Sequence, residues 1–249
     1  MNYFELRCIA YIKKDIAYKN SFNLISKYIN FSMSQDEKLK DLHKKENIFK
    51  NYSFGSFYPI EKDKIYKKGG TYSFTIRSLD EEFILKLQKY LRENVNNSFF
   101  QVIETIKKRV NRFFISELYT ITPTIVTVKD QNNKSLFWTT QKDGDILKLQ
   151  KQLQDNLLRK YENYYGKKLD PSQNFIQLIE LKNQKPQSIY FEKKINEDKH
   201  ITVRLLGNKF KIVPNEDEIS QKLAFIVLAC GLGEKQSLGG GFCLGKGIR

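Results

Sequence analysis

The chain has 249 residues, of which 43 are Lys or Arg and 28 are Asp or Glu, so its formal net charge is +15 at pH 7. Hydrophobic residues make up 40% of the sequence, which is enough for a folded core and excludes wholesale disorder. The longest apolar run, residues 223–230, is too short to span a bilayer, and no secretory signal is visible, so we expect no membrane insertion. Three widely spaced cysteines, Cys8, Cys230 and Cys243, predict free thiols and a reducing, cytoplasmic location.

The basic excess is spread along the chain and is not a detachable tail. Residues 1–117 hold 22 Lys and Arg against 14 Asp and Glu, and residues 118–249 hold the other 21 against 14. Nucleic acid is the commonest partner of such a surface, because each basic side chain on a phosphate releases condensed counterions. A lysine-rich composition inherited from an AT-biased genome is the alternative explanation of the charge.

The first half has the element order of a ferredoxin-like domain. The expected elements are a strand at 3–12, a helix opened by Asn20 that turns Phe22, Ile25 and Ile29 inward, an aromatic strand at 52–58, a strand at 71–77 after a glycine turn, a helix capped by Asp80, and strands at 99–106 and 110–118. The order β-α-β-β-α-β is the split-βαβ unit. We therefore predict one ferredoxin-like domain over residues 1–117.

The second half repeats this order less clearly. The expected elements are strands at 125–128 and 136–138, a helix from Asp145 to Gly166, strands at 175–181, 189–191 and 201–213, and a helix from residue 215 to Gly231. The prediction is an α+β fold of two tandem ferredoxin-like, RRM-like domains, 1–117 and 118–249, with a glycine-rich loop at the C-terminal end. A sheet of this kind offers an open face to single-stranded RNA.

A glycine-rich segment, Gly-Leu-Gly-Glu-Lys-Gln-Ser-Leu-Gly-Gly-Gly at residues 231–241, is the densest motif in the chain. Its spacing matches neither a dinucleotide-binding fingerprint nor an ATPase loop. Glycines let backbone N–H groups approach phosphate oxygens closely, and Lys235 stands in the middle of the segment. The segment is therefore interpreted as a phosphate-binding loop, with a flexible glycine tail as the alternative.

The pattern Gly-apolar-Gly, five residues, Gly-x-Gly resembles the C-terminal loop of the RAMP superfamily of CRISPR-associated proteins, and within it the Cas6 family of repeat-cleaving endoribonucleases. Residues 119–126 and 42–54 are similar to two further segments of that family, whereas Gly240 replaces a bulky apolar residue and is expected to loosen the loop. The resemblance implies that RNA is bound by Gly231, Gly233, Lys235, Ser237, Gly239 and Gly241.

The resemblance also implies a catalytic site. RNA cleavage without metal needs a base for the ribose 2′-OH, an acid for the 5′-oxygen and a cation for the phosphate. By resemblance, His43 is the base or acid, Lys50 the cation and Tyr28 the further acid–base group, with Tyr52 as the other tyrosine candidate. His200 is expected to lie on the surface.

The implied function is a metal-independent endoribonuclease that binds CRISPR repeat RNA and cuts the precursor, leaving a 2′,3′-cyclic phosphate and a 5′-OH. No residue spacing indicates a metal site, and no cofactor is expected. The alternatives are a non-catalytic RNA-binding RAMP subunit of an effector complex and an unrelated basic ferredoxin-like protein. Association with other Cas proteins and formation of a homodimer are left open.

Overall fold

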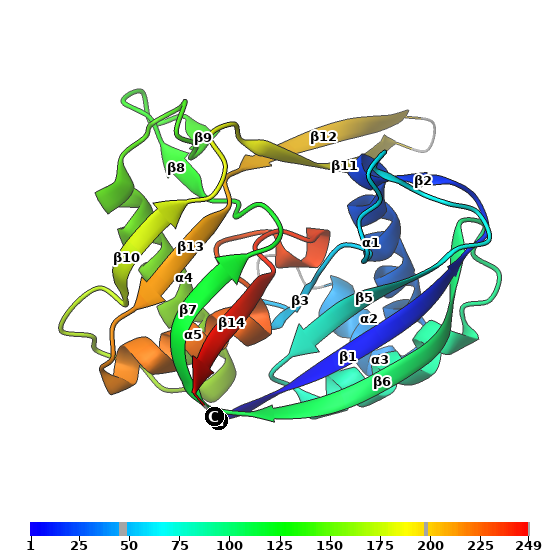
Figure 1. Cartoon of the computed structure of the whole chain (residues 1–249), viewed down its shortest axis with the longest axis horizontal. Helices are drawn as coiled ribbons and strands as arrows, with labels where there is room; N and C mark the ends of the chain where they lie inside the picture. The colour runs from blue at the N-terminus through cyan, green and yellow to red at the C-terminus, as the bar shows by residue number, and fades with distance from the viewer. Residues whose placement is uncertain (45–48, 197–198, 249) are drawn as a thin grey trace.

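The computed structural model describes residues 1–44, 49–196 and 199–248; the side chains of residues 43–44, 194–196 and 199–200 lie outside this description. Two four-stranded antiparallel sheets stand beside each other, with the helices behind them (Figure 1). The elements are β1 (Asn2–Ile12), β2 (Ile16–Ala17), α1 (Tyr18–Ser34), α2 (Glu37–Lys44), β3 (Tyr52–Phe54), β4 (Ile65–Tyr66), β5 (Thr71–Ser78), α3 (Glu81–Glu93), β6 (Phe100–Asn111), β7 (Phe114–Thr120), β8 (Thr127–Lys129), β9 (Ser135–Phe137), α4 (Ile146–Tyr165), β10 (Ile176–Leu181), β11 (Gln187–Asn196), β12 (Lys199–Gly207), β13 (Phe210–Pro214), α5 (Glu218–Cys230), the 3₁₀ turn η1 (Gln236–Leu238) and β14 (Cys243–Ile248).

The first sheet has the strand order β3-β5-β1-β6, which is the ferredoxin-like order. Alternate residues of β1, Leu6, Cys8 and Ala10 among them, are buried because the strand turns one face toward the helices. Helices α1 and α3 cover that face. Asp80 caps α3 as predicted, accepting a hydrogen bond from the Phe83 amide at 3.1 Å. Helix α1 begins at Tyr18 and so starts two residues before the expected cap, Asn20.

The second sheet has the order β10-β13-β7-β14, so its first strand is β7 and not the predicted 125–138 region. Strands β8 and β9, which occupy that region, pair only with each other among the described strands. Strand β7 runs across the boundary expected at 117/118, and the chain passes from one sheet to the other at residues 112–113. Strand β14, at the edge of the sheet, was not predicted, because two glycines interrupt its apolar pattern.

The β11–β12 hairpin leaves the second half and crosses to helix α1 of the first (Figure 1). The predicted single strand at 201–213 is therefore two strands, broken at Gly207, where a side chain would lie 2.2 Å from the Thr124 carbonyl oxygen. Ile189 and Leu205 of the hairpin are buried in the hydrophobic core of the first half. The two halves consequently share core residues.

Helix α5 lies at the junction of the two halves. After a polar first turn it is apolar on all sides, and residues 223–230 are buried because the helix packs against strands of both sheets. Arg77 of β5 fastens the same junction: its guanidinium donates to the carbonyl oxygen of Cys243 at 2.6 Å and pairs with Glu5 at 2.7 Å. Among the described residues, no helix has the length and apolar character to cross a membrane.

Candidate functional site

A cavity of about 340 Å³ opens at the junction of the two halves. Its walls come from the segment that enters β3, from α4, from the end of α5 and from the glycine-rich segment. The lining residues are Phe49, Lys50, Asn51, Tyr52, Asn156, Lys160, Cys230, Glu234, Lys235, Gln236 and Ser237. The glycine-rich segment and Lys50, which lie more than 180 positions apart in the sequence, thus line the same cavity.

The glycine-rich segment, residues 231–241, is packed against residues 123–125, between β7 and β8. At Gly241 the backbone has φ +65°, its amide donates to the Pro123 carbonyl oxygen at 2.8 Å, and an added Cβ would lie 1.8 Å from the Leu232 carbonyl oxygen. Only glycine fits such a position. A Cβ at Gly240 would lie 2.8 Å from the Glu234 carbonyl oxygen, so the glycine there tightens the loop and does not loosen it.

This packing corrects the expected role of the glycines. The amides of Gly231, Gly239 and Gly241 donate to carbonyl oxygens of the protein at 2.8–2.9 Å, and Gly233 is buried against the Ile125 backbone. These four glycines shape the loop, and the N–H groups of Gly231, Gly239 and Gly241 are already paired within the protein. Lys235 and Ser237 of the loop line the cavity.

Lys160 of α4 holds this loop from beneath and was not predicted. Its side chain is 2% exposed, and its ammonium donates to the carbonyl oxygens of Gly231 at 2.8 Å and Gly233 at 2.9 Å. Burial lowers the pKa of Lys160 to about 8. The signal in the sequence was its position on the apolar face of α4, three residues after the buried Leu157.

Wild type should gain stability relative to Lys160→Met as the pH rises from 8 to 10.5. In this window the unfolded chain keeps the lysine proton that the folded chain has lost, so the lysine contributes up to about 2–3 kcal/mol of relative stability, while methionine does not titrate. Urea unfolding of both proteins at pH 7.5 and pH 10 measures this. Lys151→Met, at an exposed position on the same helix, is the control. If the free energies of unfolding of wild type and Lys160→Met differ by the same amount at both pH values, burial has not lowered the pKa of Lys160.

Of the catalytic candidates, Lys50 lines the cavity, half-buried, and burial lowers its pKa. His43 is the seventh residue of α2, but its side chain lies outside the described part of the chain. His200 lies on β12, and its side chain is likewise not described. The structure therefore places Lys50 on the wall of the cavity, and the catalytic roles of Lys50 and His43 stay predictions.

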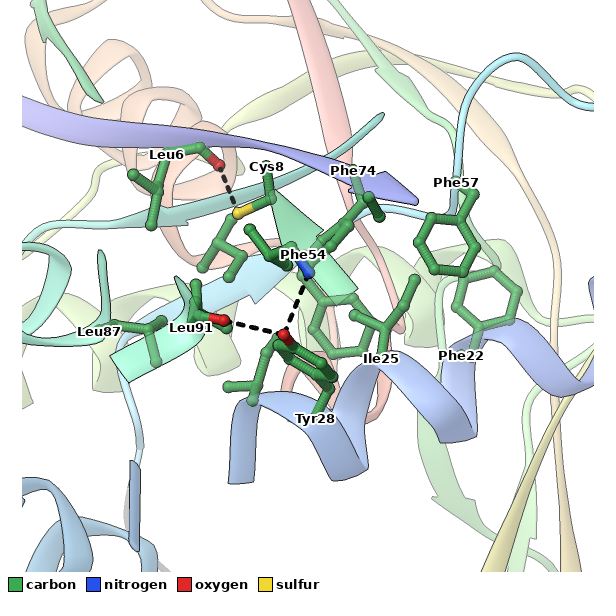
Figure 2. Packing of buried hydrophobic residues seen from close by; sticks show 14 of the residues in the cluster. Leu6, Cys8, Phe22, Ile25, Tyr28, Phe54, Phe57, Phe74, Leu87 and Leu91 are labelled. Carbon is green, nitrogen blue, oxygen red and sulfur yellow. Dashed lines mark hydrogen bonds between the residues drawn. The ribbon is translucent and has the colours of Figure 1, made fainter. Parts of the chain in front are cut away.

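Tyr28 is a core residue, which corrects its expected catalytic role. Its ring points from α1 into the hydrophobic core (Figure 2), and the side chain has no exposed surface. The hydroxyl donates toward the carbonyl oxygens of Leu91 at 2.8 Å and Asn94 at 2.9 Å and accepts from the Val102 amide at 3.1 Å. Burial raises the pKa of Tyr28 to about 12. RNA has no access to this hydroxyl, because backbone groups of the core surround it.

Tyr52, the other tyrosine candidate, does line the cavity. It is 1% exposed, stacks on Phe83 with 5.1 Å between ring centroids, and burial raises the pKa of its hydroxyl. This hydroxyl has no hydrogen-bond partner among the described residues. The raised pKa makes Tyr52 a poor base near neutral pH but leaves it a proton donor for hydrogen bonds.

The described residues contain no group of three or more His, Cys, Asp or Glu side chains that could hold a metal ion. Cys8, Cys230 and Cys243 are buried free thiols. Burial raises the pKa of the Cys230 thiol, which lines the cavity, to about 12. A neutral thiol of this kind is a weak nucleophile.

Comparison with known proteins decides the family. The family model described as "CRISPR associated protein Cas6, C-terminal" matches residues 106–244, more than half of the chain. The chain belongs to the Cas6 family. A curated Cas6 relative, CRISPR-associated endoribonuclease Cas6 2 of Methanocaldococcus jannaschii, is 26% identical over 242 residues, covering 89% of this chain and 92% of the relative.

Solved structures of the Cas6 and RAMP type share the fold along the whole chain. A structure titled "CRISPR associated protein Cas6" has a TM-score of 0.69 at 22% identity and covers 98% of this chain and 99% of its own. A RAMP protein described as binding different RNA substrates has a TM-score of 0.66 at 17% identity with the same coverage. A Cas6-related protein from Pyrococcus furiosus has a TM-score of 0.64 at 17% identity, with 98% of each chain covered. These likenesses confirm the predicted pair of ferredoxin-like domains.

Proposed function

We propose that this Cas6 protein is an endoribonuclease that binds CRISPR repeat RNA and cuts the precursor once per repeat, without a metal ion. The observation that carries the proposal is the junction cavity, which is lined by Lys50 together with Lys235 and Ser237 of the glycine-rich segment. The name of the Methanocaldococcus jannaschii relative supports it, as does the net charge of +15.

The proposed reaction is attack of a ribose 2′-OH on the adjacent phosphorus, which forms a 2′,3′-cyclic phosphate as the bond to the 5′-oxygen breaks. His43 takes or supplies the transferred proton. Lys50 stabilises the charge that builds on the phosphate oxygens, for which a partly desolvated ammonium is well suited. Lys235 and Ser237 hold the phosphate from the other wall of the cavity.

A second hollow, between the open faces of the two sheets, supports binding of single-stranded RNA. Arg7 and Thr75 of the first sheet, Leu244 of the second and the loop residue Tyr58 line it, and Tyr58 is 70% exposed. Exposed aromatic rings beside basic side chains stack on bases and pair with phosphates. The domain junction thus offers the RNA a surface outside the cavity as well.

A non-catalytic RNA-holding subunit is the second candidate, because the structure removes Tyr28 from the site and so removes one of the three expected catalytic groups. Association with other Cas proteins and formation of a homodimer also stay proposals, as does the cytoplasmic location. Light scattering of the purified chain with and without repeat RNA measures its oligomeric state.

Cleavage of repeat RNA is expected to proceed in excess EDTA and to leave a 2′,3′-cyclic phosphate and a 5′-OH. The reason is that the proposed chemistry uses only side chains of the chain itself. Denaturing gels and end analysis of the products measure this. Loss of cutting in EDTA with recovery in Mg²⁺ would contradict the mechanism, and tight binding with no cutting under single-turnover conditions would favour the RNA-holding subunit.

A further inference from the structure

We propose that the buried end of the junction cavity takes one nucleobase of the RNA and recognises its exocyclic amino group. The inference rests on the proposed function, which brings RNA to the cavity mouth, and adds a specificity-determining pocket to it. The pocket consists of Phe49, Asn51, Tyr52, Asn156 and Lys160.

Unpartnered polar atoms gather in this pocket. The amide oxygens of Asn51 and Asn156 and the hydroxyl of Tyr52 are buried and have no hydrogen-bond partner among the described residues. Asn156 is 7% exposed and Tyr52 is 1% exposed. A buried polar group without a partner costs about 1–3 kcal/mol, so three in one cavity indicate a ligand that pairs with them.

The chemistry of these atoms favours a base over a phosphate. Two of the three are amide oxygens, which only accept hydrogen bonds, and the Glu234 carboxylate lies in the same lining. Acceptors repel a phosphate oxygen but pair with the N–H₂ group of adenine, cytosine or guanine. The Tyr52 hydroxyl can donate to a ring nitrogen or a carbonyl oxygen of the same base.

The positions of the charged side chains also favour a base in the buried end of the cavity and a phosphate nearer its mouth. Lys235, a cationic group suited to phosphate, is exposed and so stands toward solvent. Lys160 is buried but already donates to two loop carbonyls. Phe49, partly exposed in the lining, provides a ring on which a base can stack, as in pockets that read flipped bases. A cavity of about 340 Å³ has room for a purine.

The test is a scan of the repeat RNA with one abasic nucleotide at each position in turn, measured as binding to wild type and to Asn156→Leu. In wild type, one abasic position beside the cut is expected to weaken binding by about 5- to 100-fold. With Asn156→Leu, the intact RNA binds more weakly, and the same abasic position costs several-fold less than in wild type, because the variant has already lost one of the contacts to the base. Replacing the amino group of that base by hydrogen should weaken binding to wild type about as much as Asn156→Leu weakens binding of the intact RNA.

Two readouts separate the pocket from a purely structural role. Asn156→Leu removes an unpaired buried acceptor, so its melting temperature should equal or exceed that of wild type while RNA binding falls. Gln152→Leu, one turn earlier on α4 and outside the cavity lining, should leave the abasic scan unchanged. If wild type binds and cuts the RNA normally but Asn156→Leu changes the cost of no abasic position, the base pocket is overturned and the proposed function is not. Water would then be the hydrogen-bond partner of the buried amide oxygens and the Tyr52 hydroxyl. Failure of wild type to bind repeat RNA would overturn the proposed function and the pocket together.

Discussion

Replacing His43 with Ala is expected to slow cleavage of repeat RNA by about 10²- to 10⁴-fold, the usual contribution of a positioned acid–base group. Binding should hardly change, because phosphate contacts dominate the affinity of a chain with a net charge of +15. Single-turnover rates and equilibrium binding, measured on the same labelled RNA, separate the two effects. Lys50→Ala should also slow the chemical step, with a small loss of affinity from the missing charge.

Two controls make this result interpretable. His200→Ala should change neither rate nor affinity, because β12 belongs to the hairpin on α1, and the described lining of the cavity includes no residue of this strand. An RNA with hydrogen in place of the 2′-OH at the cut should bind and stay intact. If an RNA whose cleavage requires the 2′-OH is cut by His43→Ala at the wild-type rate, another residue is the acid or base.

Arg77→Met is expected to lower the free energy of unfolding by about 3 kcal/mol or more. The side chain of Arg77 is 8% exposed; it pairs with Glu5 and donates to the Cys243 carbonyl oxygen of the second half. Its guanidinium also stacks over Phe242, 4.7 Å from the ring centroid. Methionine keeps much of the volume but leaves the Glu5 carboxylate and a buried carbonyl oxygen without their donor. Urea unfolding measures the change.

Arg7→Met is the matched control for stability, since Arg7 is exposed on the neighbouring strand β1 and its removal should stay within about 0.5 kcal/mol. An unchanged midpoint for Arg77→Met would show that the packing of α5 alone holds the junction.

The helices and the central strands were predictable because their side chains repeat at the spacing of one buried face. Leu149, Leu153 and Leu157 marked α4, and the caps Asp80 and Asp145 marked helix starts, all of which the structure confirms. Pairing was less predictable, because it depends on partners far away in the sequence. Strand β7 reads equally well as the last strand of one sheet or the first of the next, and only its hydrogen bonds to β13 and β14 decide.

The site was predictable where a motif marked it and not where burial made it. Lys235 and Ser237 belong to a recognisable loop, and Lys50 lies within a segment similar to the family. The resemblance implies a catalytic tyrosine, but Tyr28 lies on the inward face of α1 and is a core residue. Lys160 and Asn156 carry no motif; a lysine and an asparagine on an apolar helix face were the only sign of them.

The hairpin that crosses to α1 has a consequence for synthesis on the ribosome. The first half lacks Ile189 and Leu205 in its core until residue 205 has left the exit tunnel, and Leu238 packs against the same core even later. The nascent first half must therefore wait, with apolar surface uncovered, for nearly the whole polypeptide to be translated. Cutting the gene between the two sheets would separate two fragments that each need the other to fold.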